Sequence, residues 1–275
     1  MTDATGVKKK NTALSGAWFL TKLGLKFIHV FGAIIVFVLL WQWASTHGWV
    51  NGIIIPPPTV IASKGWELTL SGELFKHIQI SLYRVFFGFG AALVVGLLLG
   101  FLLGGWFKLI ERAVNPLLQV FSQANPFTLF PVFIVLLGLT EISKIAVIFV
   151  VCIWPILFNT ITGIKNVDPT LVKLSRSLGL TKFQIFYKVL LRGSLPSVFT
   201  GIRMSSVFAF FMLIGAEMLG ASSGLGYMIH QAQATIQYPK VWVGIVTVAL
   251  LGIIVNLALT YLEKKITGRR EEIVI

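Results

Sequence analysis

The sequence has few charged side chains and almost no cysteine. Asp, Glu, Lys and Arg together make up 12% of its 275 residues, and Cys152 is the single cysteine. One cysteine excludes an intramolecular disulfide and any metal or iron–sulfur site built from several cysteines. Soluble domains carry roughly a quarter charged residues, so this chain has too few charges to cover a water-soluble globule. Cys152 lies in an apolar run, where we expect it to pack as a small buried hydrophobe.

Two catalytic signatures are also missing. The chain contains no G-x-x-x-x-G-K-[ST] motif, so we do not expect it to hydrolyse ATP, and no H-E-x-x-H motif. Its four histidines are scattered along the sequence and do not suggest a metal site. The sequence therefore predicts neither catalytic residues nor a metal or cofactor bound by this chain.

Long apolar runs are what the sequence has in abundance. Hydrophobic residues make up 56% of the chain, and its mean hydropathy is +0.87. A helix needs about 20 apolar residues to cross a bilayer. The candidate spans are residues 27–45, 85–107, 113–140, 145–164, about 197–220, and 241–262. This pattern predicts an all-α membrane protein with six transmembrane helices.

The basic residues outnumber the acidic ones by 23 to 10, which gives a net charge of +13. Such an excess is typical either of nucleic-acid binding or of cytoplasmic loops in a membrane protein. With the N-terminus inside, the inner segments hold seventeen of the 23 basic residues and the outer segments four. This asymmetry predicts cytoplasmic termini and explains the charge without nucleic acid. The expected organisation is a cytoplasmic or interfacial segment 1–26, a six-helix domain 27–262 and a cytoplasmic tail 263–275.

The longest inner loop, residues 165–195, carries the clearest local signals. Asp168 before Pro169 is typical of a helix N-cap followed by proline at the first helical position. Leu171, Leu174 and Leu178 form an apolar stripe at helical spacing, and Gly179 is placed to end the helix.

A second helix is expected directly after the first. Thr181 and Gln184 have the spacing of a capping box, Gly193 is expected to end the helix, and Pro196 to open the fifth span. Two capped amphipathic helices are more than a connector needs. They either dock to a cytosolic partner or pack against the protein's own bundle, and the residues by themselves favour neither.

Polar side chains inside the spans are candidates for a translocation path, because polar groups in a membrane usually face the bundle or a cavity. Hydrogen bonding between helices is the competing explanation for each of them. The third span also contains Pro126 and Pro131, which should distort it. The candidates are Gln123, Asn125, Thr128, Asn159, Ser206 and Glu217.

The outer segment 220–239 is charge-poor but polar, and it predicts a loop, a short helix and a return. Ser222 or Ser223 is expected to cap the helix, and the glycines nearby allow tight turns. The segment forms either an outer gate or a plain surface loop. The candidate gate residues are Tyr227, His230 and Gln231.

One loop motif resembles that of a known family. The run from Lys173 to Gly179, followed after nine residues by Val189-Leu190-Leu191, resembles the loop that marks permease subunits of binding-protein-dependent ABC importers. Gly179 matches the pattern, whereas Lys173 replaces its acidic residue. Leu174 and Ser175 replace the two alanines, and Arg192 replaces a proline.

Other segments resemble the nitrate, sulfonate, taurine and bicarbonate group of these permeases, and the resemblance covers roughly residues 50–265. The similar segments are Asn125-Pro126 to Phe133, Asn159 to Asp168, Gly193 to Ser197, Gly201 to Arg203, Ala216-Glu217 and Ser223 to Tyr227.

The resemblance implies half of a type I importer in the bacterial cytoplasmic (inner) membrane. A homodimer or a pair of permeases would form the path, and cytosolic ATPase subunits would hold ATP and Mg. A periplasmic or lipid-anchored binding protein would deliver a small anionic solute. Lys173 would contact either an acidic patch of the ATPase or lipid phosphate. An importer of a vitamin precursor or aromatic acid, or a stand-alone secondary transporter, is the alternative. The implied coupling residues are Asp168, Leu171, Lys173, Leu174, Ser175, Arg176, Leu178 and Gly179.

Overall fold

A computed structural model describes residues 32–106, 108–123 and 126–267 of the chain. The chain divides into two compact units, Met1–Lys64 and Gly65–Ile275. Within the described ranges, every regular element is a helix. The predicted fold class, an all-α protein, is therefore confirmed for this part of the chain.

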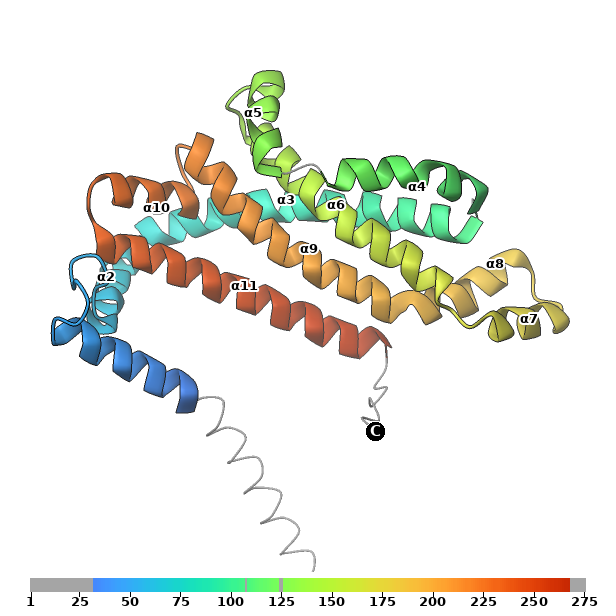
Figure 1. The fold of residues 1–275 in the computed structure, drawn as a ribbon, viewed down its shortest axis with the longest axis horizontal. Coiled ribbons are helices and arrows are strands. Elements are labelled where there is room, and N and C mark those ends of the chain that lie inside the picture. Colours follow the sequence, from blue (N-terminus) through green and yellow to red (C-terminus); the bar gives the residue numbers. More distant parts are fainter. Residues whose placement is uncertain (1–31, 107, 124–125, 268–275) are drawn as a thin grey trace, which may run out of the picture. The chain divides into compact units, whose positions relative to one another are not determined.

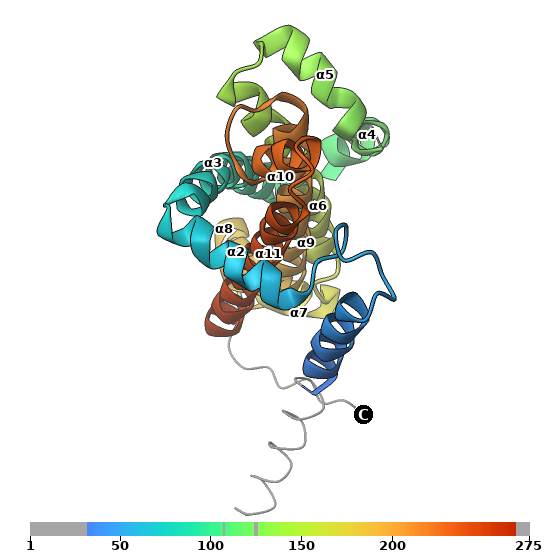
Figure 2. The same cartoon turned by 90° about the vertical axis from the view of Figure 1, so that its left-hand side faces the viewer.

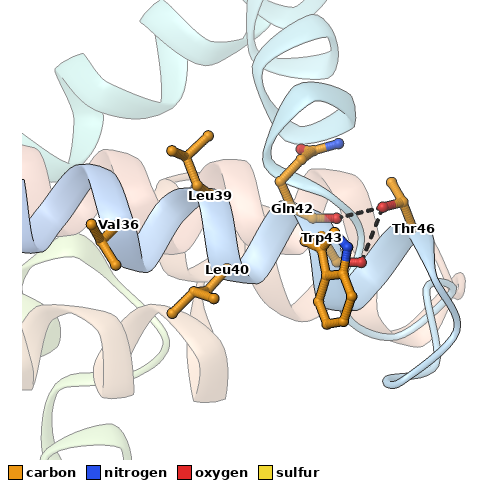
Figure 3. A pocket seen from close by; sticks show the side chains of 6 residues that line it. All are labelled: Val36, Leu39, Leu40, Gln42, Trp43 and Thr46. Atoms are coloured by element: carbon orange, nitrogen blue, oxygen red, sulfur yellow. Dashed lines mark hydrogen bonds between the residues drawn. The ribbon is translucent and has the colours of Figure 1, made fainter.

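The first unit contains the apolar helix Gly32–Thr46 and the turns after it. Ser45 donates its hydroxyl to the Ile55 carbonyl at 2.7 Å, and the rings of Trp43 and Trp49 pack edge to face. A hollow on this helix is formed by side chains of the helix alone, and the Thr46 hydroxyl beside it donates to the Gln42 and Trp43 carbonyls (Figure 3). One helix surface cannot enclose a ligand, so the hollow is no binding site. Residues 27–31 of the expected first span lie outside the described residues.

The remaining elements follow along the chain. They are α2 (Pro58–Leu70), α3 (Glu73–Phe101), the π-helix η1 (Leu102–Trp106), α4 (Lys108–Ser122), α5 (Pro126–Leu137), α6 (Glu141–Lys165), α7 (Pro169–Ser177), α8 (Lys182–Ile185), the π-helix η2 (Phe186–Leu190), α9 (Leu191–Gly220), α10 (Leu225–Ala234) and α11 (Tyr238–Thr267).

In the described ranges, four helices are long and apolar enough to cross a membrane. They are Glu73–Gly105, Glu141–Lys165, Lys182–Gly220 and Tyr238–Thr267. Leu109–Ser122 and Phe127–Leu137 meet at 94° and count as a fifth if the pair is one broken span. These helices fit a membrane protein by length and composition, and the number six stays a prediction.

The four long helices of the second unit lie alongside one another (Figure 1). α6 packs along both α3 and α9, and α11 packs on α9. At one end α10 packs on α9 and α11, whereas α7 and α8 lie at the opposite end (Figures 1 and 2). The unit thus has two ends that differ in structure, one with α10 and the other with α7 and α8.

Small residues allow α3 and α6 to approach closely. A Cβ on Gly88 would lie 2.8 Å from Ile148 Cβ, and one on Gly100 would lie 2.6 Å from Thr160 Cβ. Lipid offers no hydrophobic drive for helix association, so close van der Waals packing of this kind holds membrane helices together. The stripe occupies every fourth position: Gly88, Ala92, Gly96, Gly100 and Gly104.

The α6–α9 contact uses backbone hydrogen bonds as well as small residues. Ser205 donates its hydroxyl to the Cys152 carbonyl at 2.7 Å, and Cys152 donates its thiol to the Ser205 carbonyl at 3.3 Å. A Cβ on Gly201 would lie 2.7 Å from the Pro155 carbonyl oxygen. Cys152 is fully buried, which confirms its expected role as a small core residue.

The second span begins earlier than predicted, and Arg84 explains the error. The expected span started at residue 85 because Arg84 ends the charge-free run, but α3 begins at Glu73. Gly72, with φ +76°, provides the turn before α3. Arg84 lies inside the helix because carboxylates neutralise it there.

The predicted helix end at Gly193 and span start at Pro196 are wrong. One helical run extends from Lys182 to Gly220 and contains both residues. A Cβ on Gly193 would lie 2.9 Å from Val167 Cγ2, so this glycine serves a close tertiary contact. Pro196 has no backbone N–H and so removes one hydrogen bond from α9. A helix packed against its neighbours tolerates this loss.

The third expected span is interrupted as its prolines suggested, but only one of them marks the break. α4 ends at Ser122 and α5 begins at Pro126, where proline is favoured at the first helical position. Pro131 lies within α5 and does not end it.

Two alanine substitutions on α3 test the small-residue stripe. Gly100→Ala should destabilise the fold by about 1–3 kcal/mol, because the added methyl group meets Thr160 in a close-packed contact. Gly90→Ala on the same helix has no atom within 4 Å of its Cβ and should be neutral or stabilising by about 0.5–1 kcal/mol. Thermal unfolding of the detergent-solubilised chain measures both, and equal midpoints for the two variants would refute the role of the stripe.

Candidate functional site

A buried arginine joins three helices at the α10 end of the second unit. Arg84 of α3 has no exposed surface. Its Nε and Nη2 donate to the two carboxylate oxygens of Glu141 on α6 at 2.6 and 2.9 Å. Its Nη1 donates to Glu217 Oε1 on α9 at 2.7 Å and to the Ser223 carbonyl at 2.7 Å. Lys144 donates to Glu141 Oε1 at 2.9 Å. We call Ser81, Arg84, Glu141, Lys144 and Glu217 the Arg84 cluster.

Glu217 is also fully buried and accepts hydrogen bonds from three directions. Besides Arg84, Ser81 of α3 donates to its carboxylate at 2.8 Å. The backbone N–H of Gly226, in the first turn of α10, donates to Oε2 at 2.8 Å. Ser81 in turn accepts the Leu225 N–H at 2.8 Å. The carboxylate thus lies at the positive end of α10, where an anion is stabilised.

The glycines before and within α10 make room for this carboxylate. A Cβ on Gly224, which has φ +115°, would overlap the Glu217 carboxylate. A Cβ on Gly226 would lie 2.7 Å from both Glu217 Cβ and the Ile214 carbonyl oxygen. Glycine is therefore required at both positions so that the backbone at the start of α10 can approach Glu217 closely.

The expected serine cap of α10 is wrong. The N-cap is Gly224, without a side-chain cap, and its N–H donates to His77 Nδ1 at 3.0 Å. The free N–H groups of the first turn are satisfied by side chains from α3 and α9, so a local cap is not needed.

Sequence reasoning singled out Glu217 but not its partners. In the sequence, Arg84 stands at the edge of an apolar run, as a residue at a span boundary would. An arginine and a glutamate within apolar helices are costly unless paired, and that signal could have linked Arg84 with Glu217. Glu141 and Ser81 gave no comparable signal, because their positions depend on how α6 and α3 cross.

The predicted gate residues lie on α10, which the Arg84 cluster holds. Tyr227 is half-buried, with its ring 6.3 Å from that of His77. His230 and Gln231 are exposed. The short helix of the prediction is confirmed, and the role of its side chains as a gate stays a prediction.

The predicted path residues are not gathered at one place. Asn159 donates its amide to the Pro155 carbonyl at 2.8 Å, and Ser206 its hydroxyl to the Arg203 carbonyl at 2.8 Å, each within its own helix. Gln123 and Thr128 are exposed, and Asn125 lies outside the described residues. Glu217 is bonded to neighbouring helices, which favours helix–helix hydrogen bonding for this residue.

At the opposite end, residues 168–184 have the local structure that the sequence predicted. Asp168 accepts the Thr170 N–H at 2.8 Å and caps α7. Gly179, with φ +75°, ends the turn, and the Leu180 N–H donates to the Ser175 carbonyl at 3.1 Å. Thr181 and Gln184 form the expected capping box.

α7 has two different faces. Leu171, Leu174 and Leu178 are 49, 55 and 70% exposed, so an apolar face (the Leu face) is uncovered. Lys173 and Arg176 lie on the opposite side of the helix, since positions three or four residues apart share a face; we call this the basic face. An exposed apolar face on a rigid, capped helix is typical of a docking element.

Two substitutions at Asp168 test the cap. The hydrogen bond from the Thr170 N–H lowers the pKa of the Asp168 carboxyl, so the cap is fully present above the ordinary aspartate pKa of about 3.9 and is lost as the pH falls through the lowered value. Asp168→Ala should speed amide exchange across α7 at neutral pH, whereas Asp168→Asn should retain the cap. Hydrogen–deuterium exchange measures this, and identical exchange in the two variants would contradict the assignment.

The fold and its two ends define a class, a helical membrane protein with a capped helix that exposes an apolar face at one end and a helix held by the Arg84 cluster at the other. The model of the family "Binding-protein-dependent transport system inner membrane component" matches residues 96–268, more than half of the chain. The chain belongs to this family. The family is not catalytic, and it is located in the inner membrane, as the sequence predicted.

Relatives of this family span most of the chain. The permease protein SsuC of Bacillus subtilis, which is named for aliphatic sulfonates transport, is 37% identical, and the match covers 84% of this chain and 83% of the SsuC chain. The nitrate import permease protein NrtB of Synechocystis is 31% identical over 87% and 89%. The taurine transport system permease protein TauC of Escherichia coli is 26% identical over 88% and 90%.

A solved structure supports the fold. A chain of the MetNI methionine ABC transporter in an inward-facing conformation matches with a TM-score of 0.59 and 21% identity, over 70% of this chain and 96% of that chain. The arrangement of helices thus resembles that of the MetNI chain.

Removing the Glu217 carboxylate tests the Arg84 cluster. Glu217→Ala should lower the free energy of unfolding by about 3–5 kcal/mol, because it leaves Arg84 buried beside an incomplete set of acceptors. Glu263→Ala is the matched control: Glu263 pairs with Arg203 at 3.1 Å, but both side chains are partly exposed, and the loss should not exceed about 1 kcal/mol.

Thermal unfolding and limited proteolysis of residues 221–237 measure the two variants. The Glu217 variant should open this segment to protease, whereas the Glu263 variant should not. Equal protection of the segment in both would show that the cluster does not hold α10.

Proposed function

We propose that this chain is the membrane subunit of an ATP-driven importer for a small anion of the sulfonate, nitrate or bicarbonate class. The likeness to relatives over more than four-fifths of both chains carries this proposal. Those relatives are named for sulfonates, nitrate and bicarbonate, and these solutes share a negatively charged oxygen-bearing group. The likeness to the MetNI chain supports the same type of assembly.

In this proposal six helices span the membrane, and both termini and α7 lie in the cytoplasm. The excess of basic residues in the inner segments supports this orientation. A second permease copy completes the translocation path, a periplasmic or lipid-anchored binding protein delivers the solute, and cytosolic ATPase subunits bind ATP and Mg.

The Leu face of α7 is the surface that we assign to the ATPase. Its capped, glycine-terminated helix is rigid enough to transmit a displacement into the bundle, and its exposed leucines have no cover within the described residues. η2 and α9 continue from this loop without a break to Gly220. Motion at α7 would therefore reach Glu217 and α10 along one helix.

At the far end, we assign α10 to the outer gate and the Arg84 cluster to its attachment. Tyr227, His230 and Gln231 would face the entering solute, and Glu217 would act by holding α10. Gln123, Asn125, Thr128, Asn159 and Ser206 are proposed to line the path after the gate. A bonded and buried Glu217 supports an indirect role, because a free carboxylate would repel an anion.

Two aspartate substitutions in the loop 165–195 test the docking surface. Leu174→Asp places a charge in the Leu face and should reduce co-purification of the ATPase and solute-stimulated ATP hydrolysis by about tenfold or more, since a buried unpaired charge is costly. Asn166→Asp adds the same charge at an exposed position of the same loop, before α7 and outside the Leu face, and should leave both nearly unchanged. Equal effects of the two variants would show that the Leu face is not the contact.

Uptake measurements test the substrate class. Cells that carry the transporter should take up a labelled sulfonate, nitrate or bicarbonate in a manner that requires ATP, and the Leu174→Asp variant should abolish this uptake. Uptake driven by an ion gradient without ATP would point to a secondary transporter. Transport of an uncharged vitamin precursor or an aromatic acid, with none of these anions, would reject the proposed class.

A further inference from the structure

A cavity of about 1000 Å³ lies behind α7, on the side away from the Leu face. α7 contributes Pro169, Val172, Lys173 and Arg176 to its wall, which is the spacing of a single helix face. The basic face therefore points into the cavity. This volume is at the upper end of the roughly 300–1,000 Å³ found for sites that bind small organic molecules.

The cavity carries a strong excess of positive charge. Glu111 is its carboxylate in the described part of the chain, and Lys165 already donates to it at 2.8 Å. No described ion pair joins the other cations of the wall to a carboxylate. A hollow lined by one sign of charge concentrates the field and attracts an anion. The cationic side chains are Arg112, Lys165, Lys173, Arg176 and Lys182.

The same cavity has an apolar part. A ligand with only charged groups would make no apolar contact with this part of the wall. An amphiphile would contact the cations with its charged group and the apolar side chains with its hydrocarbon part. The apolar lining residues include Ile164, Val167, Val172, Leu180, Ile185 and Leu190.

Both π-helical segments of the second unit also reach this cavity. Gly104 and Gly105 of η1 and Phe186 and Leu190 of η2 line it. A Cβ on Gly105 would lie 3.3 Å from the Phe186 ring, so η1 and η2 pack directly on each other. π-Helical turns are rare and frequently occur at functional sites. The π-helical backbone on two sides of the cavity is therefore consistent with a binding site.

We propose that this cavity binds the phosphate headgroup of an anionic phospholipid from the cytoplasmic leaflet. The Arg112 and Arg176 guanidinium groups and the Lys173 ammonium group would contact the phosphate oxygens, and the apolar wall would contact the start of the acyl chains. Basic pockets between membrane helices on the cytoplasmic side bind such headgroups, and guanidinium groups match phosphate geometry. The location on that side rests on the proposed function.

The site explains a departure from the family motif. Lys173 stands where the loop pattern has an acid, and its helix face is turned toward the cavity instead of toward the Leu face. A bound headgroup would neutralise Lys173 and Arg176 and support α7 from behind. The lipid would thereby set the position of the helix that the ATPase contacts.

Lipid titration of the purified full chain in detergent, followed by native mass spectrometry, tests the site. Phosphatidylglycerol should bind about tenfold more tightly than phosphatidylcholine. Lys173→Gln combined with Arg176→Gln should remove that preference. Lys188→Gln combined with Arg192→Gln is the matched control, because it removes one lysine and one arginine from the same region outside the cavity wall and should preserve the preference.

A second variant tests the cavity without changing charge. Val172→Phe fills part of the space behind α7 and should also weaken phosphatidylglycerol binding. Equal losses in the two charge pairs would overturn the proposal in favour of diffuse attraction. Binding of inorganic phosphate as tight as that of the lipid would show a soluble-anion site instead.

A third result would assign the cations to a protein partner. If Lys173→Gln with Arg176→Gln keeps the lipid preference but loses co-purification of the ATPase, the basic face contacts the ATPase and the lipid site is refuted. The lipid measurement uses neither ATP nor a transported solute. Its outcome is therefore independent of whether the proposed substrate class is correct.

Discussion

The buried pair of Arg84 and Glu217 is the interaction on which the rest of the second unit depends. Both side chains lie where no water reaches them, so each charge is tolerable only because the other is present. Their partners come from α3, α6, α9 and the first turn of α10. A change in the position of any one of these elements would leave a buried donor or acceptor unsatisfied, which fixes their mutual arrangement at this end.

Close packing brings those partners within reach. The glycine stripe of α3 lets its backbone approach Ile148, Ile156 and Thr160 of α6, and Gly201 does the same between α9 and α6. Larger side chains at these positions would separate the helices, and the Arg84 guanidinium could then no longer contact two carboxylates from two helices. The small residues and the ion pair thus act together to fix how α3, α6 and α9 pack. The small residues allow the close approach, and the ion pair requires it.

The opposite end is organised by the two faces of α7. Its exposed leucines are suited to a protein contact, while its basic face lines a cavity shared with α4, α6 and α8. The helix that runs from Lys182 to Gly220 connects this end with the Arg84 cluster. A capped loop and a continuous helix therefore connect the two ends of the unit, and this connection is the one on which the proposed coupling to an ATPase depends.

The sequence by itself determined the helical class, the presence of long apolar helices, and the caps and turns of residues 168–184, because periodicity and capping depend on neighbours along the chain. It also determined the family, through the loop motif around Gly179. Only the tertiary structure decided that Arg84 lies inside a span, that Gly193 packs instead of ending a helix, and that Glu217 takes the place of a serine cap at α10. Each of these depends on a contact between residues distant in sequence, such as Arg84 with Glu217 or Gly193 with Val167, and local spacing carries no information about which helices meet.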